Sequence, residues 1–165
     1  MDSVNLREGC EKDVKLVIDM VKKLAEYEKL LDGFEATKEQ YRKYGWGKES
    51  IFKILLAEID NDLESKVVGI ALYYYTFSTF TGRPTLWLED IFVLEEFRGK
   101  GIGKAMLKQL ANVALEKGCG RMEWVVLDWN KPSWNFYLNL GAKPMSDWTT
   151  FRLTVPDIKK LAEAS

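Results

Sequence analysis

The segment at residues 89–104 constrains the fold of this chain more than any other stretch. It reads EDIFVLEEFRGKGIGK, so an apolar run is followed by three glycines and by residues at helical spacing. Glycine allows a tight turn and a close backbone approach, and the first turn of a helix presents unpaired N–H groups to an anion. Arg98, Lys100 and Lys104 add positive charge. The segment predicts a strand, a glycine-rich turn and a helix whose start suits a phosphate or pyrophosphate.

Two common phosphate-binding loops do not match this segment. A Walker loop and a dinucleotide-binding fingerprint both require a glycine five residues after the first one. Counted from Gly99, that position holds Lys104. A tight turn that binds no ligand therefore remains an alternative for the segment taken alone.

The rest of the chain alternates between patterns typical of strands and helices. The expected strands cover residues 4–8, 51–59, 67–76, 85–94, 121–127 and 150–155. The expected helices cover residues 12–31, 101–117, 132–140 and 157–164, with a further short helix that opens at a Thr37–Gln40 capping box and stops near Gly45 or Gly47. This order predicts a single α/β (α+β) domain over residues 1–165, with a mixed, mostly antiparallel sheet flanked by helices.

The composition excludes several kinds of chemistry. The chain has no histidine, so His-based triads and His metal ligands are excluded. Cys10 and Cys119 form no CxxC pair, which predicts two reduced thiols and no metal site. A net charge of -1 argues against a nucleic-acid partner. We expect a cytoplasmic protein, because no targeting segment and no stretch able to span a membrane is found.

Several motifs together carry a family resemblance. Arg98-x-x-Gly101-x-Gly103 after an apolar strand resembles the coenzyme A pyrophosphate loop of GCN5-related N-acetyltransferases, the GNAT superfamily. The sequences LAEYE at 24–28, YYY at 73–75, LED at 88–90, DWN at 128–130 and NFY at 135–137 resemble the spermidine/spermine (diamine) acetyltransferase branch. Within it, FST at 77–79 and LDWN at 127–130 are most similar to the thialysine-preferring members.

The resemblance implies a fold, a cofactor and a set of site residues. It implies acetyl-CoA bound at a splayed strand pair, a small-molecule amine as acceptor, a homodimer and no metal. Glu89 matches the family's base, which acts through water, and Tyr137 matches its acid. The implied coenzyme-binding residues are Ile91, Phe92, Val93, Arg98, Gly99, Lys100, Gly101, Ile102, Gly103, Lys104, Asn130, Lys131, Pro132, Ser133 and Tyr137. The implied acceptor-binding residues are Tyr27, Glu28, Glu89, Asp90, Glu123, Trp124, Val125, Thr149 and Phe151.

The chemistry of amine acetylation independently calls for a base such as a carboxylate at this site. A free alkylammonium has a pKa of ~10.4, so only ~0.1% is neutral near pH 7, and a base must take its proton. Side chains alternate along a strand, so Glu89 and Asp90 should point to opposite faces unless a bulge intervenes. Asn130 and Ser133 have an equally good explanation as a helix cap before Pro132.

The departures from the polyamine-preferring pattern favour a shorter acceptor. Ser78 and Thr149 stand where those members carry acidic residues, and Phe80 and Phe151 stand at tryptophan positions. A long polycation needs several carboxylates to offset desolvation of its ammonium groups. Thialysine or a small diamine is therefore favoured, and the face occupied by Glu123 stays open. The alternatives are a peptide lysine acetyltransferase on the same fold and a coenzyme A-binding module without catalysis.

Overall fold

The computed structural model describes residues 4–60 and 65–164. The chain divides into two compact units, residues 1–125 and 126–165, and each is described by itself. The predicted polar connection at residues 60–66 lies mostly outside the described residues.

The first unit is built on a five-stranded sheet with the order β1-β2-β3-β4-β5. Neighbouring strands are antiparallel except β4 and β5, which are parallel. The strands are β1 (Val4–Glu8), β2 (Lys53–Asp60), β3 (Ser65–Ser78), β4 (Arg83–Val93) and β5 (Arg121–Glu123). A mixed, mostly antiparallel sheet was predicted, and this part of the prediction is confirmed.

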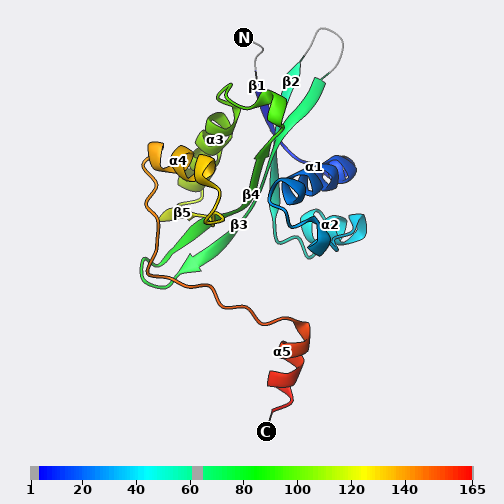
Figure 1. Ribbon diagram of the computed structural model, residues 1–165, viewed down its shortest axis with the longest axis vertical. Helices are drawn as coiled ribbons and strands as arrows, with labels where there is room; N and C mark the ends of the chain where they lie inside the picture. Colours follow the sequence, from blue (N-terminus) through cyan, green and yellow to red (C-terminus); the bar gives the residue numbers. More distant parts are fainter. Residues whose placement is uncertain (1–3, 61–64, 165) are drawn as a thin grey trace. The chain divides into compact units, whose positions relative to one another are not determined.

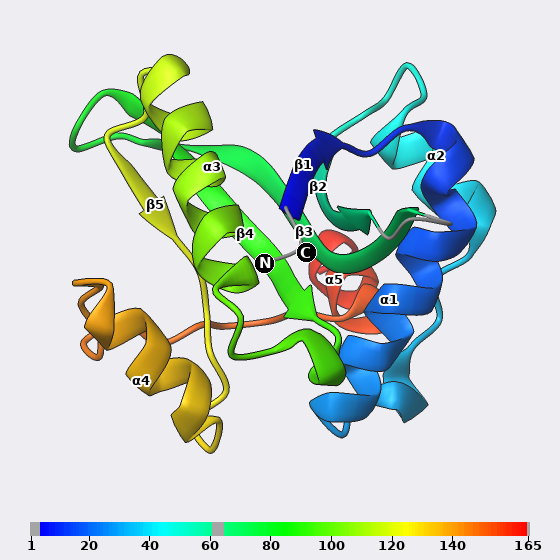
Figure 2. The same cartoon turned by 90° about the horizontal axis from the view of Figure 1, so that it is seen from above.

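Helices cover both faces of the sheet (Figures 1 and 2). One face carries α1 (Val14–Tyr27) and α2 (Lys38–Gly45), and the other carries α3 (Ile102–Glu116). Short 3-10 turns at Glu11–Asp13, Leu31–Gly33 and Glu95–Phe97 join these elements. Apolar side chains of α1 pack with Ile54 and Leu56 of β2, Ile70 and Leu72 of β3 and Phe92 of β4. That core identifies the residues of each strand that face α1.

Local signals define several helix ends. The capping box is confirmed, because the Gln40 backbone N–H donates to Thr37 Oγ1 and the Thr37 N–H donates to Gln40 Oε1, at 3.3 and 2.8 Å. The helix predicted over residues 12–31 is shorter than expected and ends at Tyr27. The helix ends early because Lys29 has a left-handed backbone, with φ of 62°, and an α-helix cannot continue through that conformation.

A β-bulge interrupts the pairing of β3 with β4. Leu72 lies opposite Asp90, whereas the next residue, Tyr73, lies opposite Leu88. Glu89 is therefore an extra residue on β4 without a partner on β3. The β4–β5 ladder ends just before it, at the pair Trp87 and Glu123. This explains why β5 is much shorter than the strand predicted over residues 121–127.

An ion-pair network anchors the start of α1 to the sheet. The Arg7 guanidinium donates to Asp13 through both terminal nitrogens at 2.7 and 2.9 Å, and through Nε to Glu58 at 2.8 Å. These hydrogen bonds from Arg7 lower the pKa of Asp13 to about 2. One guanidinium thus pairs with two carboxylates at this end of α1.

The second unit contains α4 (Lys131–Asn139) and α5 (Val155–Ala162). The strand predicted over residues 150–155 is wrong, since the structure has no regular element between 150 and 154. Thr154 instead forms a capping box with Asp157, its hydroxyl donating to Oδ2 at 2.7 Å, and Pro156 stands in the first turn. A helix start therefore replaces the end of the predicted strand.

Candidate active site

The bulge places two adjacent carboxylates on the same face of the sheet. Asp90 lies opposite Leu72, which packs against α1. Glu89 reaches the same face, because its carboxylate accepts hydrogen bonds from Tyr74 and Trp87. Those two residues are themselves a directly opposed cross-strand pair, and Tyr74 packs against the α1 core. The bulge therefore brings Glu89 and Asp90 to the same face, as the sequence allowed only if a bulge intervened.

Glu89 is an exposed carboxylate in a fixed orientation. The Tyr74 hydroxyl donates to its Oε2 at 2.9 Å and the Trp87 indole Nε1–H donates to the same oxygen at 3.0 Å. Burial, followed by the hydrogen bond and charge of Glu89, raises the pKa of Tyr74 to about 12. The phenol is therefore a proton donor throughout the neutral range.

Asp90 is half-buried and lies in an acidic environment. Burial, followed by the negative charges of Glu89 and Glu28, raises its pKa to about 7. Glu28 follows the last residue of α1, and burial raises its pKa as well. Within residues 4–60 and 65–164, no lysine or arginine forms an ion pair with any of these three carboxylates. This acidic cluster is suited to a cation supplied from outside.

Sequence reasoning assigned no role in the site to three aromatic residues around this cluster. Tyr74 and Trp87 hold Glu89, and Tyr41 of α2 has its pKa raised to about 12 by burial and by the charges of Asp90 and Glu89. Tyr74 and Trp87 could have been found by pairing the two strands through the hairpin. That pairing requires the register on both sides of the bulge, which no single segment of sequence contains.

The glycine-rich turn has the backbone conformation that its sequence predicts. Gly99 and Gly101 have φ of 75° and 81°, and Gly101 is the N-cap of α3. A Cβ atom at either position would contact nothing within 4 Å. Glycine is therefore favoured here by the left-handed backbone and not by lack of space. Ile102, Gly103 and Lys104 form the first turn of α3, where N–H groups are unpaired within the helix.

Arg98 connects this turn to the acidic cluster. Its guanidinium lies 4.7 Å from the centre of the Tyr27 ring and 5.3 Å from that of Phe92. Its Nε also donates to the Val93 carbonyl at 2.9 Å. Because Tyr27 directly precedes Glu28, the contact joins the predicted coenzyme loop to the predicted acceptor residues on α1.

The outer edge of β4 beyond Trp87 lacks a β-strand partner among the described residues. Leu94 N–H donates to Val68 of β3 at 2.9 Å, so alternation directs the backbone groups of Ile91 and Val93 to the opposite, outer edge. One of these groups, the Val93 carbonyl, accepts from Arg98. Lys100 lies over the Phe97 ring, 5.0 Å from its centre.

Other predicted acceptor residues in the first unit differ in their placement. Glu123 lies beside Trp87 in the parallel ladder, which places it on the α1 face, but its carboxylate pairs with Arg121 at 3.1 Å. Trp124 is half-buried and Val125 is exposed. Ser78 is buried in the β3–β4 turn, where its Oγ accepts from the Thr81 N–H at 3.3 Å.

The remaining predicted residues belong to the second unit. Asn130 is the buried N-cap of α4, accepting from the Ser133 N–H at 3.4 Å, and Lys131 and Pro132 form the first turn. The capping explanation for Asn130 and Ser133 is therefore confirmed. Tyr137 lies on α4, with its ring 5.2 Å from that of Phe136. Thr149 is exposed and Phe151 is 92% exposed.

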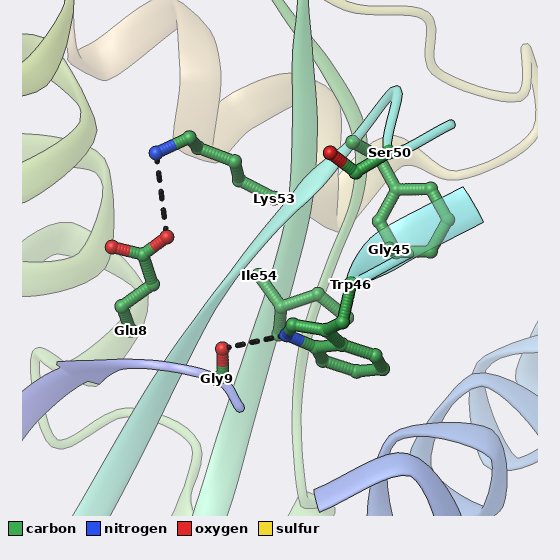
Figure 3. A pocket seen from close by; sticks show the side chains of 8 residues that line it. Glu8, Gly9, Gly45, Trp46, Ser50, Lys53 and Ile54 are labelled. Atoms are coloured by element: carbon green, nitrogen blue, oxygen red, sulfur yellow. Dashed lines mark hydrogen bonds and ion pairs between the residues drawn. The ribbon is translucent and has the colours of Figure 1, made fainter. Parts of the chain in front are cut away.

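A separate cavity of about 260 Å³ lies between the ends of β1, α2 and the start of β2 (Figure 3). The indole of Trp46 donates to the Gly9 carbonyl at 3.0 Å, and Lys53 pairs with Glu8 at 3.3 Å. None of its lining residues belongs to the predicted site. In the part of the chain that the structure describes, no group of three or more acidic or Cys side chains could hold a metal ion, and no helix could cross a membrane.

Comparisons with known proteins identify the family of this chain. The model of the acetyltransferase (GNAT) family matches residues 20–142. A thialysine N-epsilon-acetyltransferase of Sus scrofa is 41% identical over 169 residues, covering 98% of this chain and 99% of that protein. Spermidine/spermine N(1)-acetyltransferase-like protein 1 of Homo sapiens is 33% identical over 168 residues, covering 98% of this chain and 24% of that protein.

The fold is also found among solved structures. An integron cassette protein from the mobile metagenome of V. cholerae matches with a TM-score of 0.78 and 26% identity, covering 98% of this chain and 99% of that one. The resemblance and the fold expected from the motifs are thereby confirmed. The chain belongs to the GNAT family and is an N-acetyltransferase.

Proposed function

We propose that this protein transfers an acetyl group from acetyl-CoA to the primary amine of a small, cationic molecule. Thialysine and short diamines are the first candidates for the acceptor. The observation that carries the proposal is the bulge at Glu89, which gathers Glu89 and Asp90 on the α1 face with no cation paired to them in the described structure. An ammonium group bound there would supply the missing positive charge.

The residues of the first unit fit the coenzyme. The turn at Gly99 and Gly101 and the unpaired N–H groups that open α3 suit a pyrophosphate. The outward-facing backbone groups of Ile91 and Val93 suit the amides of an extended pantetheine arm, as an added strand would. When bound, acetyl-CoA supplies the activated acetyl group as a thioester. Asn130 and Ser133 remain candidates for further contacts with the coenzyme.

Two residues are proposed to move protons. Glu89 accepts a proton from the acceptor ammonium through a water molecule, since its carboxylate is exposed and already oriented by two donors. Tyr137 of α4 donates a proton to the departing sulfur and regains one from the second proton that the nitrogen loses as the amide forms. A phenol of pKa ~10 can donate to a thiolate of pKa ~8.5 while staying protonated at neutral pH.

The number of uncompensated carboxylates favours a short acceptor. Ser78 is occupied in a turn, and the carboxylate of Glu123 is paired with Arg121. The first unit therefore offers Glu28, Glu89 and Asp90 to a cation, and Asp90 is partly protonated near neutral pH because its pKa is about 7. This charge matches one or two ammonium groups better than the four of spermine. The Sus scrofa relative, a thialysine N-epsilon-acetyltransferase, has a name that points to the same class of acceptor.

A homodimer is part of the proposal, as the resemblance implies. Large apolar side chains at the C-terminal end support it, with Trp148 76% and Phe151 92% exposed. Light scattering during size-exclusion chromatography measures the mass directly. A single species at the monomer mass of 19.1 kDa would contradict the proposed dimer.

The test is a panel of acceptors assayed with acetyl-CoA. We expect kcat/KM to be highest for thialysine or a short diamine and lower for spermidine, spermine and a lysine peptide. Glu89→Gln should abolish most of the turnover, whereas the exposed control Glu116→Gln should retain it. A preference for spermine would overturn the argument on acceptor size, and a preference for the peptide would favour a protein acetyltransferase. Coenzyme binding without turnover on any amine would contradict the proposed function.

A further inference from the structure

Resting on the proposed function, we infer that Tyr74 and Trp87 are positioning residues of the reaction. Both donate a hydrogen bond to Oε2 of Glu89, which leaves Oε1 as the oxygen that receives the proton of the acceptor. Tyr74 is the central residue of the YYY motif, which carries no assigned site residue, and Trp87 lies outside the motifs. The inference rests on their two hydrogen bonds, on the bulge and on the strand register.

The bulge creates the need for such support. Glu89 is exposed and lies outside the β3–β4 ladder, so its backbone is not held by a cross-strand partner. A free glutamate side chain has rotamer freedom that must be lost when it works in one geometry. Donors at 2.9 and 3.0 Å on one oxygen reduce that freedom before the acceptor arrives. Among the described residues, no other hydrogen bond reaches this carboxylate.

The two donors are rigidly placed. Tyr74 and Trp87 are directly opposed in the β3–β4 ladder, on the side of the bulge where pairing is regular. The Tyr74 ring packs against the α1 core, and Trp87 is half-buried. A half-buried ring fixed by strand pairing provides a donor whose position does not depend on the substrate.

Both groups remain donors under working conditions. The indole N–H can only donate, and Tyr74 keeps its proton because its pKa is raised to about 12, chiefly by burial. Both groups therefore continue to donate to Oε2 of Glu89 throughout the neutral pH range.

The test is a double-mutant cycle with a pH profile. We expect Tyr74→Phe and Trp87→Phe each to lower kcat about tenfold, the loss expected for one hydrogen bond to a charged group. The KM for acetyl-CoA should stay within about twofold, and the acid limb of the kcat/KM profile should move to higher pH because a donor to the carboxylate is lost. In a Glu89→Gln background the same substitutions should change kcat by less than about twofold.

Tyr75→Phe is the matched control. Tyr75 is the next residue of β3 and faces the other side of the sheet, where its ring meets that of Tyr73 at 6.2 Å. It should leave kcat and the pH profile unchanged. Equal losses in the wild-type and Glu89→Gln backgrounds would overturn the inference, because they would indicate a packing role. So would an unchanged kcat and pH profile in both variants.

A second measurement separates this inference from the proposed function. The indole N–H resonance of Trp87, assigned by its loss in Trp87→Phe, should follow a pH titration that disappears in Glu89→Gln. This readout needs no substrate. If it is observed in a protein that acetylates no amine, the proposed function fails and the hydrogen-bonded unit stands. A Trp87 resonance that is insensitive to Glu89→Gln would overturn the inference whatever the activity.

Discussion

The two ends of α1 hold clusters of carboxylates with opposite electrostatic environments. At its start, Asp13 and Glu58 share the Arg7 guanidinium, and the pKa of Asp13 falls to about 2. Beyond its last turn, Glu28 lies close to Asp90, whose pKa rises to about 7 through burial and like charges. The first cluster is an anchor in which an internal cation pairs with both carboxylates. The second cluster has no paired cation among the described residues, which costs stability and favours binding of a cation.

The largest effect is expected from the exposed member of the uncompensated cluster. Glu89→Gln removes the proposed base, and we expect kcat to fall by roughly 10² to 10³, the usual contribution of general base catalysis. Steady-state kinetics with the best acceptor measure the loss, and calorimetric binding of acetyl-CoA should be unchanged. Retention of full turnover would remove Glu89 from the mechanism.

Asp90→Asn should separate binding from stability. We expect the KM for the amine at pH 8 to rise about tenfold, equivalent to about 1.4 kcal/mol, because one charge opposite the ammonium is lost. In the unsubstituted protein, this KM should rise as the pH falls through about 7, where Asp90 becomes neutral. The variant should lose that step in the profile of KM against pH.

The same substitution should raise the free energy of unfolding at pH 8. The pKa of Asp90 in the folded protein, about 7, exceeds its ordinary value of 3.8, so the folded state binds the extra proton and stability falls as the pH rises between these values. Removal of the charge should stabilise by roughly 1–3 kcal/mol at pH 8 and by little at pH 4. Urea unfolding at both values checks the sign, and a loss of stability at pH 8 would contradict the acidic environment described here.

Asp13→Asn should have the opposite sign. The pKa of Asp13 is depressed from 3.8 to about 2, so its contribution to stability is present above pH 4 and is lost as the pH falls toward 2. Since Arg7 is partly exposed, we expect a loss of only about 1–2 kcal/mol at pH 7. Measured by urea unfolding, the difference in the free energy of unfolding between the two proteins should shrink from pH 7 to pH 2. Activity at pH 7 should be retained.

The smallest effect should come from Glu28→Gln, which sharpens the account of the second cluster. Glu28 is the third cause of the raised pKa of Asp90, after burial and the charge of Glu89. We expect the pH midpoint of the amine KM to move lower by a few tenths of a unit, because one repulsive charge is removed. A midpoint that moves upward would show that Glu28 does not act as a repulsive neighbour of Asp90.

The outcome of the sequence predictions follows the distance over which each signal acts. The predictions of the Thr37 capping box and of the turn at Gly99 and Gly101 were correct, because caps and turns of positive φ depend on residues a few positions apart. The end of α1 at Tyr27 was missed, since neither glycine nor proline marks the left-handed Lys29. The strand predicted at 150–155 is absent, because Thr154 and Asp157 form a capping box that begins α5. The spacing of these two residues in the sequence is typical of such a box.

The sequence by itself determined the family, the glycine turn before α3 and the carboxylates available to the reaction, because these depend on residue identity and short spacing. Only the tertiary structure decided that Glu89 and Asp90 share a face and that Tyr74 and Trp87 hold Glu89. The physical reason is the register of β3 against β4. One extra residue in β4 reverses the alternation beyond it, and that residue can be identified only when both strands are paired.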